Sequence, residues 1–341
     1  MQVGIFLTNQ NPVGSDMVAK LDEQLAMTRL ARDRGWDLVA SGHHYLSEGA
    51  SQLQLVPFLS RLAAEAGHMT GVAGILLLGL HNPVEVAETM ASLDIIWGGR
   101  FVFGIGLGYR DVEFDAFKVP RGQRVRRFES CLEIVKRLWT EDTVSVDSDV
   151  CTLKDVSLTC RPVQRPHPPI WVAANNDKAI QRAARIGDTW FINPHATMTT
   201  IVRQMSVYRA ELARVGKTFP RVLPIFKEIF CAKDRATALA LAGPYLSSKY
   251  KTYAAWGQDA VMPDGETFKQ PFESLLEDRF VIGSPEECYE QLRPCWEKVG
   301  ATMLVLRTQW IGLPAAHALD SMRLISEELL PALHQVKTAA D

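Results

Sequence analysis

The chain has 341 residues, of which 47% are hydrophobic, and its 37 Lys and Arg against 39 Asp and Glu give a formal net charge of −2. This balance gives no electrostatic reason to expect nucleic acid or an acidic membrane surface as a partner. No apolar run approaches the roughly 20 residues of a membrane-spanning helix, and we expect no signal peptide. The six scattered cysteines form no CxxC pair, which is typical of reduced thiols and predicts a cytoplasmic protein.

Strand and helix patterns alternate along the chain. The runs 72–78 and 101–105 are apolar almost throughout, which is typical of strands buried on both faces of a parallel sheet. Strand–helix units repeated in this way predict a (β/α)8 TIM barrel, with a doubly wound sheet as the alternative. The predicted strands are 2–7, 37–40, 72–78, 101–105, 170–173, 188–192, 223–232 and 302–306, and the predicted helices are 20–34, 53–66, 83–97, 121–139, 178–186, 197–215, 234–246 and 314–333.

Two segments interrupt this alternation within what we predict to be a single domain, residues 1–341. Residues 140–167 contain two short strand-like pieces, which predict a hairpin appended to a loop. Residues 248–282 are aromatic and polar and lie between the seventh and eighth predicted strands. An insertion of this length is longer than an ordinary connection, so we expect a mobile lid there.

Two adjacent histidines, His43 and His44, directly follow the second predicted strand. Neighbouring side chains at a strand end point in opposite directions, so one ring is expected to face the mouth of the barrel. A neutral imidazole there can donate a hydrogen bond or move a proton near pH 7, whereas the alternative is a purely structural pair. No second cluster of His, Asp and Glu has the spacing of metal ligands, so we predict no metal site.

Glycines mark the ends of the third and fourth predicted strands, at Gly74 and at Gly104, Gly106 and Gly108. The latter group resembles a dinucleotide-binding loop, but Asp111 stands where the third glycine of GxGxxG is required. The next predicted helix also begins too late for phosphate capture at its N-terminus. A glycine-lined wall against the edge of a flat isoalloxazine ring agrees better with this spacing.

Polar residues at other predicted strand ends suggest sites for anions and substrate. Asn175 and Asn176 precede a predicted helix, where they can cap it or help to bind a phosphate. Arginines concentrated in 121–127 form either a solvated helix start or a cationic rim for a phosphate. Arg307, Trp310 and Trp190 lie at or near strand ends and either line a substrate pocket or belong to the core.

These features together resemble the bacterial luciferase-like flavin monooxygenase family over almost the whole chain. The resemblance depends on the order and spacing of several segments rather than on a single motif. They are His43-His44, Gly71-Val72-Ala73-Gly74, Asn82-Pro83, residues 99–108, Arg127-Phe128-Glu129, Pro162-Val163-Gln164, Pro168-Pro169-Ile170 and the long segment after the seventh strand.

The resemblance implies reduced FMN (FMNH2), usually supplied by a separate NAD(P)H:flavin reductase, at the carboxyl ends of the strands. It implies insertion of one oxygen atom from O2 into a small, mainly apolar organic substrate through a flavin C4a-(hydro)peroxide. It also implies a homodimer. His44, with His43, is the expected catalytic residue, and the Ala73–Gly74 bond is where the family often has a non-prolyl cis peptide. The expected cofactor-binding residues are Ala73, Gly74, Gly106, Tyr109, Asn175 and Asn176.

The chain departs from the light-emitting members of the family at Gly106-Leu107, where those members have a cysteine next to an arginine. We therefore expect a non-luminescent monooxygenase. In those members the arginine would bind the phosphate of the cofactor. We expect Arg110, or one of Arg124, Arg126 and Arg127, to bind it here. Two alternatives remain open, namely a deazaflavin-dependent dehydrogenase or reductase on the same fold and a non-catalytic flavin-binding barrel.

Overall fold

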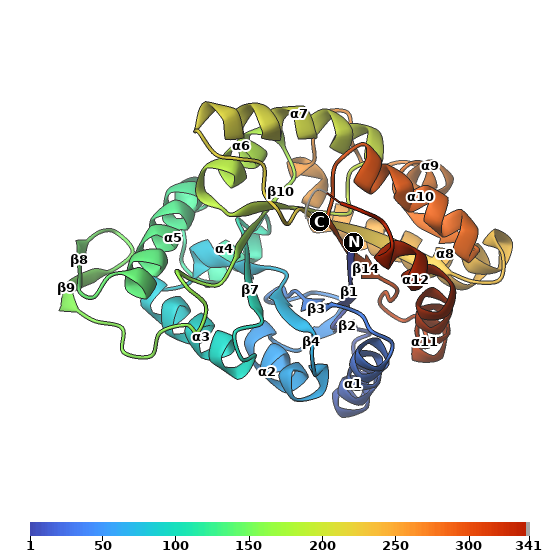
Figure 1. Cartoon of the computed structure of the whole chain (residues 1–341), viewed down its shortest axis with the longest axis horizontal. Helices are drawn as coiled ribbons and strands as arrows, with labels where there is room; N and C mark the ends of the chain where they lie inside the picture. The colour runs from blue at the N-terminus through green and yellow to red at the C-terminus, as the bar shows by residue number, and fades with distance from the viewer. Residues whose placement is uncertain (339–341) are drawn as a thin grey trace.

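The computed structural model describes residues 1–338 and has a closed barrel of eight parallel strands at its centre (Figure 1). Strand β14 pairs with β1, and β10 pairs with β7, so the ring of strands has no free edge. The predicted TIM barrel is therefore confirmed and the doubly wound sheet is excluded. In order around the ring the strands are β1 (Gln2–Leu7), β3 (Leu38–Ser41), β5 (Thr70–Ala73), β7 (Phe101–Gly106), β10 (Ile170–Ala174), β11 (Thr189–Ile192), β12 (Pro224–Cys231) and β14 (Met303–Arg307).

Helices surround this barrel, and several of them begin at residues whose side chains accept hydrogen bonds from the free N–H groups of the first turn. Asp16 accepts hydrogen bonds from Val18 N and Ala19 N, and Ser284 forms a reciprocal capping box with Glu287. The helices are α1 (Met17–Asp33), α2 (Leu55–Ala66), α3 (Pro83–Ile96), α5 (Arg124–Thr140), α6 (Asp177–Ile186), α7 (Met198–Arg214), α8 (Arg235–Ala255), α10 (Pro285–Glu297), α11 (Ala315–Leu324) and α12 (Leu330–His334).

Two hydrophobic layers hold the barrel and its helices together. The interior of the barrel is filled by one or two side chains from each strand, among them Phe6, Trp171, Phe191 and Phe226. The larger layer lies between the strands and the surrounding helices and includes Trp36, which is fully buried and donates to Ser326 Oγ at 2.9 Å. The interior layer reaches the carboxyl ends of the strands, where Phe6, Phe191 and Phe226 are exposed to a cavity at the usual place for a site in this fold.

Several short elements were not predicted. The expected strand 72–78 is interrupted after β5, and the chain continues as β6 (Leu76–Leu77) and the 3₁₀ turn η1 (Leu78–Leu80). Helix α4 (Asp111–Ala116) fills the stretch between β7 and the 3₁₀ turn η2 (Arg121–Gln123), and it is too short to show an apolar period. The appended hairpin has β8 (Val144–Asp147) paired antiparallel with β9 (Thr152–Val156).

The segment 248–282 also contains more regular structure than its composition suggests. Helix α8 extends through Ala255, and the 3₁₀ turn η3 (Gln258–Val261) and helix α9 (Phe272–Leu276) follow. Strand β13 (Val281–Gly283) then pairs with the end of β12. A further short pair joins β2 (Gln10–Asn11) to β4 (Ser51–Gln52).

Two findings bear on the expectations from composition. Among the described residues, no helix is both long enough and apolar enough to cross a membrane. All six cysteines are free, and four of them are buried.

The contact between β5 and β7 predicts which glycine tolerates a side chain least. A Cβ atom on Gly104 would lie 1.9 Å from the Ala73 carbonyl oxygen, whereas one on Gly122 would meet no atom within 4 Å. We expect Gly104→Ala to lower the free energy of unfolding by at least about 2 kcal/mol, because the backbone of β5 or β7 must move to make room for the methyl group. Gly122→Ala is the matched control, and urea unfolding measures both. Equal stability of the two variants would contradict the close approach of these strands.

Candidate active site

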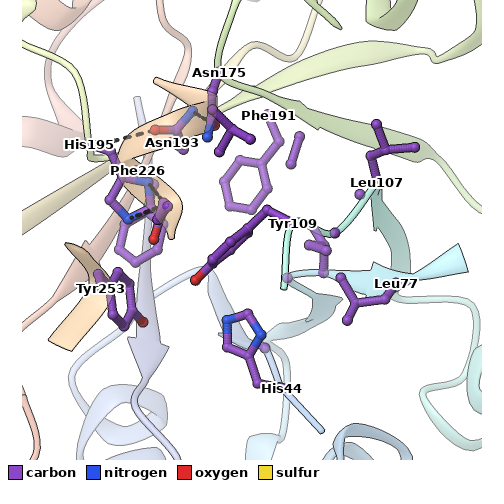
Figure 2. A pocket seen from close by; sticks show the side chains of 18 of the residues that line it. His44, Leu77, Leu107, Tyr109, Asn175, Phe191, Asn193, His195, Phe226 and Tyr253 are labelled. Atoms are coloured by element: carbon purple, nitrogen blue, oxygen red, sulfur yellow. Dashed lines mark hydrogen bonds between the residues drawn. The ribbon is translucent and has the colours of Figure 1, made fainter. Parts of the chain in front are cut away.

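A cavity of about 260 Å³ opens at the carboxyl ends of the barrel strands. Its walls come from loops after most of the strands, and Figure 2 shows side chains converging on it from several sides. Most of the predicted site residues line this cavity: His43, His44, Gly74, Gly106, Tyr109, Asn175 and Asn176. The exception is Ala73, which is fully buried in β5 and pairs in register with Ser41.

One wall of the cavity is made by glycines whose backbones approach one another closely. A Cβ atom on Gly42 would lie 2.4 Å from Gly74 O, and one on Gly106 would lie 2.5 Å from Ile75 Cδ1. A Cβ atom on Gly74 would lie 3.2 Å from the Phe6 ring. The absence of side chains leaves a surface of backbone that a flat ring can approach.

The non-prolyl cis peptide bond joins Gly74 to Ile75, so the expected position at Ala73–Gly74 is wrong by one bond. The β5 ladder explains this difference. Ala73 still pairs in register with Ser41 of β3, and Gly74 N donates to Ser41 O at 2.7 Å. The chain leaves the ladder only after Gly74, so the cis bond lies one residue beyond the expected position.

His43 and His44 have different surroundings. His43 is buried, and its Nδ1 lies 2.9 Å from Gln54 Oε1. Burial lowers the pKa of His43 from 6.5 to about 4, with the Gln54 hydrogen bond opposing the shift, so the ring is neutral at pH 7. In the part of the chain that the structure describes, His43 Nε2 has no hydrogen-bond partner.

His44 forms a pair with a carboxylate that the sequence analysis missed. Its Nδ1 lies 3.0 Å from Oε1 of Glu113, which is fully buried on α4. The same oxygen accepts from Tyr45 N at 2.9 Å and lies 3.6 Å from Arg110 Nη1. Glu113 follows His44 by 69 residues on an unpredicted helix, so no local pattern could have revealed the pair. A carboxylate on Nδ1 orients the ring and favours Nε2 as the nitrogen that faces a ligand.

Tyr109 extends into the cavity between His44 and Phe191, with its hydroxyl directed toward Tyr253 (Figure 2). Its ring meets that of His44 edge to face, with centroids 5.6 Å apart. The hydroxyl has no partner among the described residues, and burial raises the pKa of Tyr109 well above its ordinary value. Tyr109 is therefore protonated and has a donor available for a ligand.

The two asparagines lie beside a helix N-terminus and an arginine. Asn176 caps α6 by accepting from Ala179 N at 3.1 Å, and Asn175 Oδ1 accepts from Asn193 Nδ2 at 2.6 Å. Arg121 and Arg124 also line the cavity. A helix N-terminus and an arginine in one cavity can together bind a phosphate.

The other candidate arginines are already engaged elsewhere. Arg110 is buried, donates to the carbonyls of Tyr45 and Leu46 at 2.6 and 3.0 Å, and lies over the Trp256 ring at 4.3 Å. Arg126 pairs with Asp149 on the surface, and Arg127 donates to Gly79 O at 3.2 Å. Arg124 is thus the candidate that the structure places in the cavity wall.

A buried polar cluster lies on the opposite arc of the barrel. Glu228 on β12 accepts from Lys249, from Arg307 Nη1 at 3.2 Å and from Trp310 Nε1 at 3.0 Å. Arg307 is the member of this cluster that lines the cavity. Trp310 supports the cluster, and Trp190 belongs to the core, where it donates to Ala174 O at 3.1 Å.

The residues present fit a flat, phosphate-bearing cofactor. The glycine wall accepts a ring, the N-terminus of α6 with Arg124 accepts a phosphate, and Tyr109 and His43 each have a polar atom without a partner among the described residues. Within residues 1–338, no group of three or more His, Cys, Asp or Glu side chains is placed to hold a metal ion.

Comparison with known proteins agrees with this geometry. The profile of the luciferase-like monooxygenase family matches residues 1–303. The chain therefore belongs to the luciferase-like monooxygenase family. This membership confirms the expected family and the enzyme class, that of flavin-dependent monooxygenases.

One curated relative is the FMNH(2)-dependent dimethylsulfone monooxygenase of Pseudomonas putida, which is 25% identical over 306 residues that cover 83% of this chain and 84% of the relative.

Solved structures show the same fold at lower identity. The monooxygenase RslO1 from Streptomyces bottropensis aligns with a TM-score of 0.85 at 24% identity and covers 97% of this chain and 99% of its own. The oxygenating constituent of 3,6-diketocamphane monooxygenase from Pseudomonas putida, in complex with FMN, has a TM-score of 0.80 at 17% identity and 99% coverage of both chains. An F420-dependent secondary alcohol dehydrogenase shares the fold with a TM-score of 0.77 at 15% identity, covering 97% of this chain and 98% of its own.

The environment of His43 predicts a dependence of stability on pH. Its pKa is about 4 in the folded chain, against an ordinary value of 6.5, so the unfolded chain takes up a proton first as the pH falls. The free energy of unfolding should therefore decrease between pH 6.5 and 4, by up to about 3 kcal/mol from this residue. Urea unfolding of His43→Gln should show a shallower pH dependence than the unmodified chain. The exposed His68 provides the control, and an equal effect of His68→Gln would contradict this assignment.

Proposed function

We propose that the chain is the oxygenase component of a two-component monooxygenase that uses reduced FMN and O2 to insert one oxygen atom into a small, mainly apolar organic substrate. The single observation that carries this proposal is the cavity itself, because it combines a glycine wall, a phosphate-binding end and a histidine–carboxylate pair. The FMN named for two of the similar proteins supports the choice of cofactor.

The cavity divides into parts with different roles. Gly42, Gly74 and Gly106 would lie against the flavin ring, and Asn176 with Arg124 would bind its phosphate. Bound reduced FMN supplies the electrons that activate O2. The aromatic rings of Phe191 and Phe226 would bind the apolar body of the substrate, because both line the cavity and lie side by side with centroids 6.2 Å apart.

His44 is our candidate for the residue that controls a proton at the reacting centre. Glu113 holds its Nδ1, which leaves Nε2 to donate to or accept from a bound group. Tyr109 lies beside His44 and supplies a second donor. His43 is neutral and bonded to Gln54, so we assign it a positioning role.

We further propose that residues 248–282 form a lid over this cavity. Tyr253, Gln258 and Val261 from this segment line the cavity. Trp256 meets the His44 ring edge to face at 5.5 Å and lies over Arg110. Closure of this segment would exclude water from the reacting centre, which oxygen activation on a flavin requires.

The partner that follows from this function is an NAD(P)H:flavin reductase, which would supply the reduced FMN. A homodimer and a cytoplasmic location stay predictions. One of the similar structures is an F420-dependent dehydrogenase, so a deazaflavin-dependent dehydrogenase is the second candidate function. Comparing the binding of FMN with that of F420 distinguishes the two candidates.

The function predicts selective binding of reduced FMN and a protein-dependent reaction with O2. Under anaerobic conditions the chain should bind reduced FMN more tightly than reduced F420. When O2 is admitted, stopped-flow absorbance should show an additional phase before oxidised flavin appears, because the closed cavity excludes water. His44→Ala should shorten this phase while FMN binding persists. Preference for F420, or reoxidation identical to that of free reduced FMN, would refute the proposal.

The phosphate assignment predicts a difference between FMN and riboflavin. Arg124→Met should weaken FMN binding about ten- to a hundredfold, because a charge-assisted hydrogen bond to the phosphate is lost. Riboflavin has no phosphate, so its dissociation constant should change little. Arg126→Met is the matched control because Arg126 is exposed and pairs with Asp149. Fluorescence titration measures all four combinations, and equal losses for FMN and riboflavin would argue against this role.

A further inference from the structure

We propose that Arg307 binds an acidic group of the substrate, so that the substrates are small organic anions with a short apolar body, such as alkanesulfonates or carboxylates. This inference rests on the proposed function, because it concerns the substrate of the same cavity. It adds a specificity-determining residue, and it narrows the substrate class.

Arg307 lies at the carboxyl end of β14, where its guanidinium packs against two aromatic rings that are stacked on each other. Its Cζ atom lies 4.5 Å from the centroid of Phe6 and 4.8 Å from that of Phe226. Phe6 in turn adjoins the glycine wall, since a Cβ atom on Gly74 would lie 3.2 Å from its ring. Only the Phe6 ring therefore separates a group bound to Arg307 from the surface that we assign to the flavin ring.

The hydrogen bonds of the guanidinium are incompletely used by the protein. Arg307 Nη1 donates to Glu228 Oε1 at 3.2 Å, while Nε has no partner among the described residues. Arg307 is 93% buried, with 7% of its surface exposed, and it lines the cavity. A guanidinium has five N–H donors in a planar fork that matches the oxygens of a carboxylate or sulfonate.

The charges around Arg307 also favour an anion. Glu228 faces two cationic side chains, Lys249 and Arg307, and both of its oxygens already accept hydrogen bonds. No Asp or Glu lines the cavity in the part of the chain that the structure describes. Two cationic side chains thus face a single carboxylate here, and a bound anion would compensate the excess positive charge.

The FMN phosphate is not the anion expected at Arg307. Asn176 and Arg124 belong to the loops and helices after β10 and β7, whereas Arg307 ends β14. Strands β11 and β12 separate β10 from β14 around the barrel. The other negative group available is the pyrimidine edge of reduced FMN, which has the same hydrogen-bonding chemistry, so the experiment needs separate arms for substrate and flavin.

Calorimetric titration with matched anionic and neutral ligands tests the proposal. The probes are 1-butanesulfonate and pentanoate, compared with the neutral butyl methyl sulfone and pentanamide. The titrations use the full chain saturated with oxidised FMN and, separately, the Arg124→Met variant without flavin. In the first, FMN occupies the phosphate site; in the second, the loss of Arg124 weakens that site, and no flavin binding is needed. If the assignment of FMN as the cofactor is wrong, the second arm therefore still tests the role of Arg307.

We expect each anion to bind at least about tenfold more tightly than its neutral counterpart, as a charge-assisted pair predicts. Arg307→Met should remove this preference, and Arg307→Lys should retain part of it. The exposed Arg323 on α11 provides the control, since Arg323→Met should leave the preference unchanged. The comparison of ligands on the unmodified chain stays decisive even where Arg307→Met fails to fold.

Two results would overturn the proposal. One is equal affinity of the unmodified chain for anionic and neutral probes. The other comes from an anaerobic titration with reduced FMN: a tenfold loss of reduced-FMN affinity in Arg307→Met, with the anion preference retained, would assign the guanidinium to the flavin. A change below about twofold in that titration, together with loss of the anion preference, supports the substrate assignment.

Discussion

The arrangement of the site depends on the close approach of backbone segments around the end of β5. Gly42, Gly104 and Gly106 come from the strands or loops on either side of residues 73–75, and a Cβ atom on any of them would lie within 2.5 Å of that segment. Steric clash with residues 73–75 therefore excludes side chains at these three positions. An apolar barrel filled by large residues elsewhere has a bare surface at this one place, and a planar ring fits such a surface.

The arc of the barrel formed by β12 and β14, across from the glycine wall, instead contains large charged side chains that are deeply buried. Removing Glu228, Lys249 and Arg307 from water costs several kcal/mol for each ion, so their retention needs compensating hydrogen bonds. Trp310 and the rings of Phe6 and Phe226 hold them in place. Fixed charges in a dry environment interact strongly with a bound group, because little solvent is present to screen them.

Much of the fold and part of the site could be predicted from local patterns. Buried strands are apolar at nearly every position, and residues at their carboxyl ends lie at one mouth, so His44, Gly106 and Asn176 could be expected near one another, and the structure has all three in the cavity wall. The short helix α4 has no apolar period, so it was missed together with Glu113. The register of β5 against β3 decides where the ladder ends, and sequence alone does not show that register.

The sequence pattern was least informative for interactions between distant segments. Arg307 was noted only as a residue after a strand, because its meaning depends on Glu228 and Lys249, which precede it by 79 and 58 residues. The same holds for Trp256, which meets His44 only after the chain has passed around most of the barrel. Such contacts are set by closure of the sheet, which brings the last strand beside the first.

These separate features together restrict how a substrate can lie. In the proposed function, the glycine wall would set the plane of the flavin ring, and the phosphate-binding end near α6 would set its direction in that plane. Arg307 packs against Phe6, which adjoins Gly74, so a substrate anchored there would extend its apolar body toward the flavin. Two such anchors in one cavity would hold the reacting atoms near each other and lower the entropic part of the barrier. His44 lines the same cavity, and Glu113 and Trp256 hold its ring in place there.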